Sequence, residues 1–138
     1  MDWMLLPLRR YAEFSGRSRP KEYWMFALFV FLVSLAALIV DMLLGFGDAV
    51  SGSTKAPGFW AGWAAAGGGG PLTLIVSLAM LVPGLAVTIR RLHDSDRSGW
   101  WILIAFVPLV GFLALMVFMI LGGTRGPNRF GSDPLEGA

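Results

Sequence analysis

The side chains best able to do chemistry lie in one short charged stretch, "IRRLHDSDRSGWW", which runs from Ile89 to Trp101. It holds three arginines, two aspartates and the only histidine of the chain, between two long stretches without charge. A histidine beside an aspartate, as in His93 and Asp94, is typical of a general base or a metal site. A zinc site needs three or four ligands, however, and one histidine without any cysteine leaves only scattered carboxylates. General-base catalysis also needs a nucleophile and a charge stabiliser nearby, and the sequence indicates neither. We therefore expect no catalytic residue, no metal ligand and no cofactor.

The same stretch has the spacing of ion pairs on a helix. Arg90 and Arg91 precede Asp94 by four and three residues, and Arg97 follows it by three, so each guanidinium is within helical reach of that carboxylate. Surface pairs of this kind contribute only about 0–1 kcal/mol each. Arginines beside an apolar block also fix the orientation of a membrane protein, but that role needs neither His93 nor the aspartates. The surplus of polar groups indicates a binding site.

Two further motifs carry charge next to apolar blocks. The first is "FSGRSRPKEYW", residues 14–24, whose basic side chains can attract anionic headgroups at roughly 1 kcal/mol each or act only as a general clamp at the membrane surface. The second is "GGTRGPNRFGSDP", residues 122–134, whose Gly, Pro, Asn and Asp predict successive turns in an ordered tail that docks on its own membrane face. The candidate binding residues all lie in these three motifs: Arg17, Arg19, Arg90, Arg91, His93, Asp94, Arg97, Trp100, Asn128, Arg129 and Asp133.

The composition of the chain is that of a membrane protein. Hydrophobic residues make up 56% and charged residues 14% of it, whereas soluble domains carry roughly 25% charge. The apolar residues form three uninterrupted blocks, at about 23–44, 72–89 and 100–121. About 20 helical residues cross the roughly 30 Å hydrocarbon core, and only a helix satisfies the backbone there. The sequence therefore predicts an all-α membrane protein with three transmembrane helices in a single domain, residues 1–138.

The remaining segments are predicted from their local composition. Pro20 and Pro71 are expected to start helices, because proline lacks the N–H that a first helical residue leaves unpaired. A short interfacial segment is expected before the first span, a Gly/Ala-rich loop at 45–70, and the tail at 122–138. Asp41 is the only charged residue within an apolar block, and we expect it at the interface because it lies close to the end of the block.

The third block leaves two topologies open. Pro108 and Gly111 lie near its middle, where they can kink a span or turn the chain back as a re-entrant hairpin. A hairpin needs shielding by protein, so we expect the kinked span. The positive-inside rule places the N-terminus in the cytoplasm either way. The basic residues divide eight inside to three outside with three spans, and ten to one with a hairpin.

The three motifs together resemble the small bacterial inner-membrane proteins called domain of unknown function 805. The order and spacing of the motifs match that family from Tyr11 to Pro134, and the segment 45–70 looks like an insertion relative to its compact pattern. The resemblance implies a multi-pass protein of the bacterial inner membrane, and it implies no activity, since the family has none established.

Three functions are compatible with these observations. We favour a non-enzymatic membrane component that binds lipids, especially anionic headgroups, or a membrane partner such as a second copy of the chain. The alternative is a subunit of an oligomeric transporter or channel. An enzyme built from His93, Asp94, Arg129 and Asp133 is less favoured, because three spans would put the second loop and the tail on opposite sides. Eleven basic and nine acidic residues are too balanced to indicate nucleic-acid binding.

Overall fold

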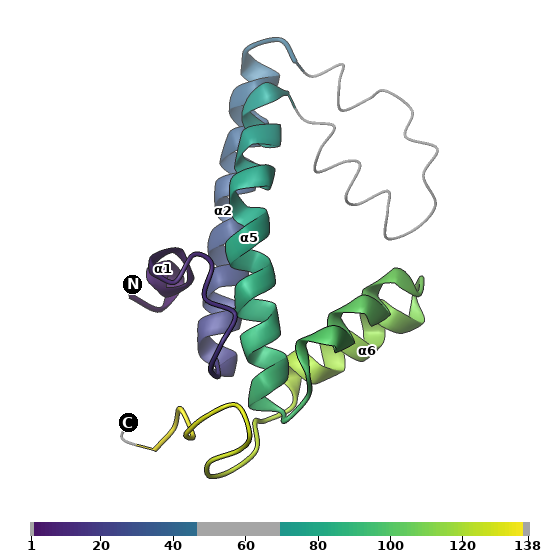
Figure 1. Ribbon diagram of the computed structural model, residues 1–138. Coiled ribbons are helices and arrows are strands. Elements are labelled where there is room, and N and C mark those ends of the chain that lie inside the picture. Colours follow the sequence, from purple (N-terminus) through teal and green to yellow (C-terminus); the bar gives the residue numbers. More distant parts are fainter. Residues whose placement is uncertain (1, 47–69, 137–138) are drawn as a thin grey trace. The chain divides into compact units, whose positions relative to one another are not determined.

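The computed structural model describes residues 2–46 and 70–136, so most of the Gly/Ala-rich loop predicted at 45–70 lies outside the described residues. The described chain is helical, apart from turns and one isolated bridge between Asn128 and Gly131. The elements, in chain order and with the labels of Figure 1, are α1 (Asp2–Arg9), α2 (Pro20–Leu43), α5 (Pro71–Asp94), the 3₁₀ helix η1 (Gly99–Phe106) and α6 (Val110–Ile120). The all-helical prediction is confirmed.

The two long helices, α2 and α5, are long and apolar enough to cross a membrane. Each has 24 residues, which at a rise of 1.5 Å per residue is about 36 Å, against a hydrocarbon core of about 30 Å. They begin at Pro20 and Pro71, as the sequence predicts. Only 17% and 22% of their most apolar windows are buried, and large side chains such as Phe31 and Leu78 lie exposed. Outward-facing apolar side chains at this density fit lipid rather than water as the surrounding solvent.

The third apolar block is not the continuous span that we expected. It forms η1, a turn, and α6, and these two short helices pack against each other as the arms of a hairpin (Figure 1). The turn has Leu109 at a positive φ of 64°, and Val107 donates from its backbone N–H to Ile104 O at 2.9 Å. Pro108 disfavours helix in the residue before it, and Gly111 lies so close to the Ile104 carbonyl that an added Cβ would overlap it. Neither arm has the length of a span.

The chain divides into two compact units. The first comprises residues 1–27 and 82–138, which include α1, the first turns of α2, the second half of α5, the hairpin and the tail. The second comprises residues 28–81, with the remainder of α2 and α5.

Within the second unit, Asp41 has a helix-capping role that the sequence did not predict. Its carboxylate accepts hydrogen bonds from the backbone N–H groups of Leu72 (3.2 Å) and Thr73 (2.7 Å) and from the Thr73 hydroxyl (2.7 Å). These are donors at the start of α5, which have no partner within their own helix. Nearby, α2 ends with Gly45 at φ 89° and with Phe46 N–H donating to Asp41 O at 2.9 Å. That arrangement is a Schellman motif, in which glycine adopts the left-handed conformation cheaply.

Candidate functional site

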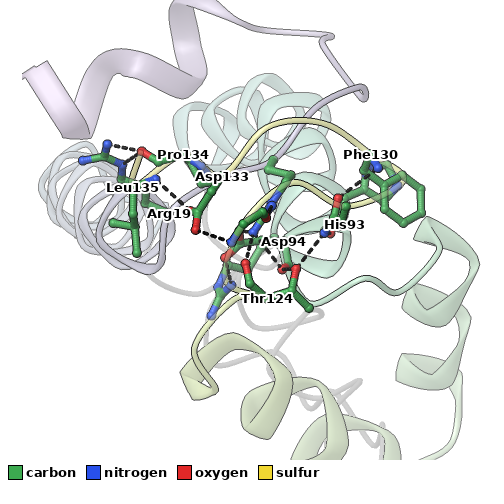
Figure 2. Close-up of polar contacts among 12 residues, drawn as sticks. Arg19, His93, Asp94, Thr124, Phe130, Asp133, Pro134 and Leu135 are labelled. Atoms are coloured by element: carbon green, nitrogen blue, oxygen red, sulfur yellow. Dashed lines mark hydrogen bonds and ion pairs between the residues drawn. The ribbon is translucent and has the colours of Figure 1, made fainter. Parts of the chain in front are cut away.

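The site is built on the C-terminal end of α5, in the first unit. The helix closes with a Schellman motif, since Asp96 N–H donates to His93 O and Arg97 N–H donates to Leu92 O, both at 3.0 Å, with Asp96 at φ 54°. The tail supplies the remaining partners. Thr124 N–H donates to Asp94 O at 2.8 Å, and Asn128 Nδ2 donates to His93 O at 3.0 Å. The segments before and after the hairpin therefore meet, as Figure 2 shows for Asp94 and Thr124.

The Asp94 carboxylate lies between two guanidinium groups. Arg17 approaches Oδ1 with Nε at 3.0 Å and Nη2 at 2.9 Å, and Arg91 donates to Oδ2 from Nη1 at 2.5 Å. All three side chains are buried, with exposed fractions of 7% or less. The Cα of Gly123 packs against the carboxylate so closely that a Cβ would overlap it. Because both oxygens are occupied and water is excluded, this carboxylate acts as the counter-charge of the two arginines.

Both arginines also hold the end of the hairpin and the start of the tail. Arg17 donates to Gly126 O at 2.7 Å and to Thr124 O at 2.5 Å. Arg91 donates to Leu121 O, the carbonyl that follows α6. The last carbonyls of a helix have no intrahelical partner and form the negative end of its dipole, so a guanidinium is well suited to them. Each arginine thus combines an ion pair with the capping of carbonyl groups.

Arg90 has a different partner from the one predicted. Its Nη1 lies 3.0 Å from Oε1 of Glu22 in the first turn of α2, and both side chains are almost fully buried. Arg90 O also accepts from Ser18 N–H at 3.1 Å. The predicted pair of Arg90 with Asp94 is wrong, because both Asp94 oxygens are taken by the other two arginines. The pair of Arg91 with Asp94 at a spacing of three is confirmed.

His93 joins the N-terminal motif to the tail. Its Nδ1 lies 3.2 Å from Gly16 O, and its ring stacks on that of Phe130 with centroids 4.0 Å apart and planes at 3° (Figure 2). A carbonyl oxygen only accepts, so Nδ1 carries the hydrogen in this contact. This arrangement holds three chain segments together, while the Asp94 carboxylate is bonded to Arg17 and Arg91.

The tail is held by Asp133 and Arg19. Asp133 accepts from the backbone N–H groups of Leu135 and Gly126, each at 2.9 Å, and Arg19 Nε donates to Pro134 O at 2.5 Å (Figure 2). The two backbone N–H groups, with a smaller contribution from the Arg17 and Arg19 guanidiniums, hold the pKa of Asp133 below its ordinary value. The turns predicted for this segment are present, and they dock on the end of α5.

The remaining candidate residues lie at the surface. Arg97 does not pair with Asp94 as predicted; its guanidinium carbon lies 4.1 Å from the ring centroid of Phe118 in α6. Arg129 pairs with Asp96 at 3.2 Å, with both side chains about half exposed. Trp100, at the start of η1, is 78% exposed. These three side chains are accessible to a ligand, whereas the buried side chains of Arg17, Arg90 and Arg91 are not.

Sequence reasoning missed three residues that contact the buried cluster or belong to it: Glu22, Gly123 and Thr124. Glu22 is the only carboxylate in "FSGRSRPKEYW", and its position inside a basic motif is a signal of pairing. Gly123 and Thr124 act through backbone placement, which has no sequence signal of its own. Within residues 2–46 and 70–136 there is no group of three or more potential metal ligands. The arrangement provides a cluster of buried ion pairs, with the exposed Arg129–Asp96 pair outside it.

Comparison with known proteins identifies a family and two inner-membrane relatives. The family described as "Protein of unknown function (DUF805)" matches residues 11–132. The chain is similar to inner membrane protein YhaH of Escherichia coli K12, at 42% identity over 134 residues, or 97% of each chain. It is also similar to inner membrane protein YhaI of the same strain, at 41% identity over all of this chain and 99% of the relative. No solved structure matches.

These alignments correct one prediction and settle the location. Since 134 residues are 97% of both this chain and YhaH, the two chains have nearly the same length, and the segment 45–70 is not a long insertion relative to that relative. The inner-membrane names of the relatives and the two candidate spans together indicate an inner-membrane protein. By its match over most of its length, the chain belongs to the DUF805 family, whose function is unknown.

Proposed function

We propose that this chain is a non-enzymatic inner-membrane protein that binds anionic lipid headgroups on its cytoplasmic side. In this proposal α2 and α5 span the bilayer, and the exposed basic residues of the first unit bind the headgroups. The buried arginines hold that face together. The observation that carries the proposal is the backbone hydrogen bond from Thr124 N–H to Asp94 O, which ties the tail to the second loop.

If the second loop and the tail lie on the same side of the membrane, the basic residues are distributed very unequally between the two sides. Ten of the eleven basic residues then lie on one side, and only Lys55, in the loop between the spans, lies on the other. Cytoplasmic loops carry the excess of Lys and Arg, so the positive-inside rule favours a cytoplasmic location for both termini. Two full spans are supported by the lengths of α2 and α5.

The distribution of arginines decides which of them can bind lipid. Arg17, Arg90 and Arg91 are buried and neutralised by Asp94 and Glu22, so a headgroup cannot reach them. Arg9 and Arg125 are exposed. Arg129 is exposed too, and its pair with Asp96 is of the weak surface kind, worth about 0–1 kcal/mol. A basic residue near the membrane surface adds about 1 kcal/mol of attraction to anionic lipid.

Topology is the first part to test, and the absence of cysteine makes it accessible. Single cysteines at Ser53, Ser95 and Ser132 would be labelled with an impermeant maleimide in intact cells and in opened membranes. The proposal expects Ser53 to be labelled in intact cells, and Ser95 and Ser132 only after opening. Labelling of Ser132 together with Ser53 in intact cells would contradict it, because the third block would then cross the bilayer.

Lipid binding is tested by the retention of phosphatidylglycerol during purification in a mild detergent. The triple variant Arg9→Gln, Arg125→Gln and Arg129→Gln should lose most of its enrichment of phosphatidylglycerol over phosphatidylethanolamine, because about 1 kcal/mol per residue is roughly fivefold in affinity. Lys55→Gln is the matched control, since it removes one positive charge from the opposite side. Equal enrichment in the triple variant, the control and the natural sequence would overturn the proposal.

A further inference from the structure

The hairpin formed by η1 and α6 exposes apolar side chains along both arms. From Trp100 to Leu121 the sequence contains no charged residue and, apart from the tryptophan N–H groups, no polar side chain. No residue of η1 is buried, and only Gly111 and Met119 of α6 are. The most exposed positions are spread over the base, the turn and both arms: Trp100 (78%), Phe106 (63%), Leu109 (72%), Val110 (63%) and Ile120 (62%). Exposed apolar side chains therefore lie along the whole hairpin and are not confined to one face. This distribution favours lipid acyl chains, which can surround the hairpin, over one docked protein surface.

The backbone of the hairpin is hydrogen-bonded internally to an extent that suits hydrocarbon. Beyond their first turns, the 3₁₀ and α segments satisfy their N–H groups within the helix. In the turn itself, Val107, Val110 and Gly111 donate to the carbonyls of Ile104, Pro108 and Val107. Pro108 has no N–H to satisfy. Non-helical backbone at membrane depth normally needs shielding by protein, because unpaired polar groups are costly in hydrocarbon. In this turn, hydrogen bonds within the hairpin replace part of that shielding. The turn can therefore lie in an environment without water.

The length of each arm is about half of the hydrocarbon core. The eight residues of η1 rise about 2 Å each, and the eleven residues of α6 about 1.5 Å each, so each arm is about 16 Å long. The core is about 30 Å thick. Two arms of equal length that start and end beside Asp94 would place the turn near the middle of the bilayer.

The base of the hairpin carries the residues that favour the interface. Trp101 packs edge-on against Phe118, with centroids 5.7 Å apart, and the Arg97 guanidinium lies over the same ring. Tryptophan rings prefer the headgroup level, and arginine can place an apolar stem along hydrocarbon with its charge in the headgroups. The turn, from Phe106 to Val110, has no such group.

We infer that this hairpin is a wedge embedded in one leaflet of the bilayer, covered by the acyl chains of that leaflet, with its turn at the midplane. The inference rests on the proposed topology, which puts the base of the hairpin on the cytoplasmic side. The partner is lipid hydrocarbon, and a second copy of the chain is the competing occupant.

The test is a depth measurement in vesicles of phosphatidylethanolamine and phosphatidylglycerol. Single cysteines at Leu109, in the turn, and at Ser98, before the base, are spin-labelled, and relaxation by oxygen and by a polar nickel chelate is compared. Lipids labelled at known acyl positions calibrate the depth. If the hairpin is embedded in this way, the label at Leu109 should lie at the midplane, with high accessibility to oxygen and low accessibility to the nickel chelate. The label at Ser98 should lie at the headgroups.

Three results would overturn the wedge. Nickel access at Leu109 as high as at Ser98 would place the hairpin on the surface. Low access to both reagents at Leu109 would indicate that a second copy covers it. A Leu109 label at the midplane with Ser132 labelled from outside the cell would show a full third span, which refutes the proposed topology as well. Shielding of Ser132 with a surface position for Leu109 would refute the wedge alone.

Discussion

Two buried aspartates, one in each compact unit, are held in different ways. Asp41 is fully buried in the second unit and accepts hydrogen bonds from neutral donors, the backbone N–H groups and the hydroxyl at the start of α5. Asp94 is equally buried in the first unit and accepts from two arginine guanidiniums. Each carboxylate is covered by a glycine, Gly70 for Asp41 and Gly123 for Asp94.

The two sites differ in the donor groups that would be left facing the side chain if the carboxylate lost its charge. Neutral donors at a helix start can be satisfied by any side-chain oxygen of suitable length. Two buried guanidiniums, by contrast, are left without a counter-charge in a site that excludes water, and an uncompensated buried charge is very unfavourable. The same residue type therefore has a local, replaceable role at Asp41 and a long-range, irreplaceable role at Asp94. The variants below test this contrast.

Asp94→Asn is expected to have the largest effect. The amide keeps the shape but removes the charge that faces Arg17 and Arg91, so the free energy of unfolding in detergent should fall by about 3–5 kcal/mol. Denaturant titration of the purified protein measures this change. The tail should also detach, because Arg17 holds the carbonyl groups of Thr124 and Gly126, and limited proteolysis near Arg125 reports that.

The control for Asp94→Asn is Asp96→Asn, which removes a half-exposed carboxylate two residues away that pairs with Arg129. Exposed pairs contribute about 0–1 kcal/mol, so this variant should remain close to the natural sequence. Equal destabilisation by the two variants would show that burial does not distinguish these pairs, and the contrast with Asp41 would lose its basis.

Gly123→Ala should have the next largest effect. The added Cβ would overlap the Asp94 carboxylate, so the tail or the ion pairs must shift, at a cost of about 1–3 kcal/mol. The control is Gly122→Ala, where a Cβ meets nothing within 4 Å. Gly70→Ala is the counterpart in the second unit, with a Cβ 2.7 Å from Asp41 Cγ. Equal stability of Gly123→Ala and Gly122→Ala would mean that the tail is not packed on the carboxylate.

Local signals in the sequence predicted the parts of this architecture that depend on neighbouring residues. Pro20 and Pro71 marked the helix starts, because the chemistry of a first helical residue is local. The Arg91–Asp94 pair followed from a helical spacing of three. The contact between Arg17 and Asp94 spans 77 residues, and no period or motif encodes that distance. It depends on the antiparallel arrangement of the first turns of α2 and the last turns of α5.

The third block shows why a composition signal was not sufficient. Twenty-two apolar residues meet the length requirement of a span, and Pro108 and Gly111 are compatible with either a kink or a hairpin. The hairpin depends on contacts beyond the block, namely the Thr124–Asp94 backbone bond and the donation from Arg91 to Leu121 O. Arg91 and Asp94 lie in the motif before the block and Thr124 lies in the motif after it, so the residues of the block alone do not predict these contacts.

Asp41 variants test the other side of the contrast, with a smaller effect. Asp41→Asn should lower the free energy of unfolding far less than Asp94→Asn, because asparagine keeps one of the two acceptor oxygens and faces only neutral donors. Asp41→Ala should cost about 0.5–2 kcal/mol, since it leaves the Leu72 and Thr73 N–H groups unpaired. Denaturant titration distinguishes the two. A loss for Asp41→Asn as large as that for Asp94→Asn would show that the charge of Asp41 matters as well, and the contrast would fail.

The smallest expected effect is the acid dependence of the tail, which Asp133 controls. Backbone N–H groups of Leu135 and Gly126, and then the Arg17 and Arg19 guanidiniums, lower the pKa of Asp133 below its ordinary value of 3.8. A lowered pKa means that the folded tail favours the ionised form. The stabilisation is therefore complete above the ordinary pKa and is lost as the pH falls through the lowered one.

A spin label at Ser132 should accordingly report a tail that is immobile from neutral pH down to about 4 and that loosens in stronger acid. Asp133→Asn should be looser than the natural sequence at neutral pH, should approach it in strong acid, and should lack the part of the acid transition that belongs to Asp133. Glu136→Gln, an exposed carboxylate in the same tail, is the control and should keep the natural profile. An unchanged acid transition in Asp133→Asn would contradict this prediction and would assign the transition to another carboxylate, with Asp94 the first to test.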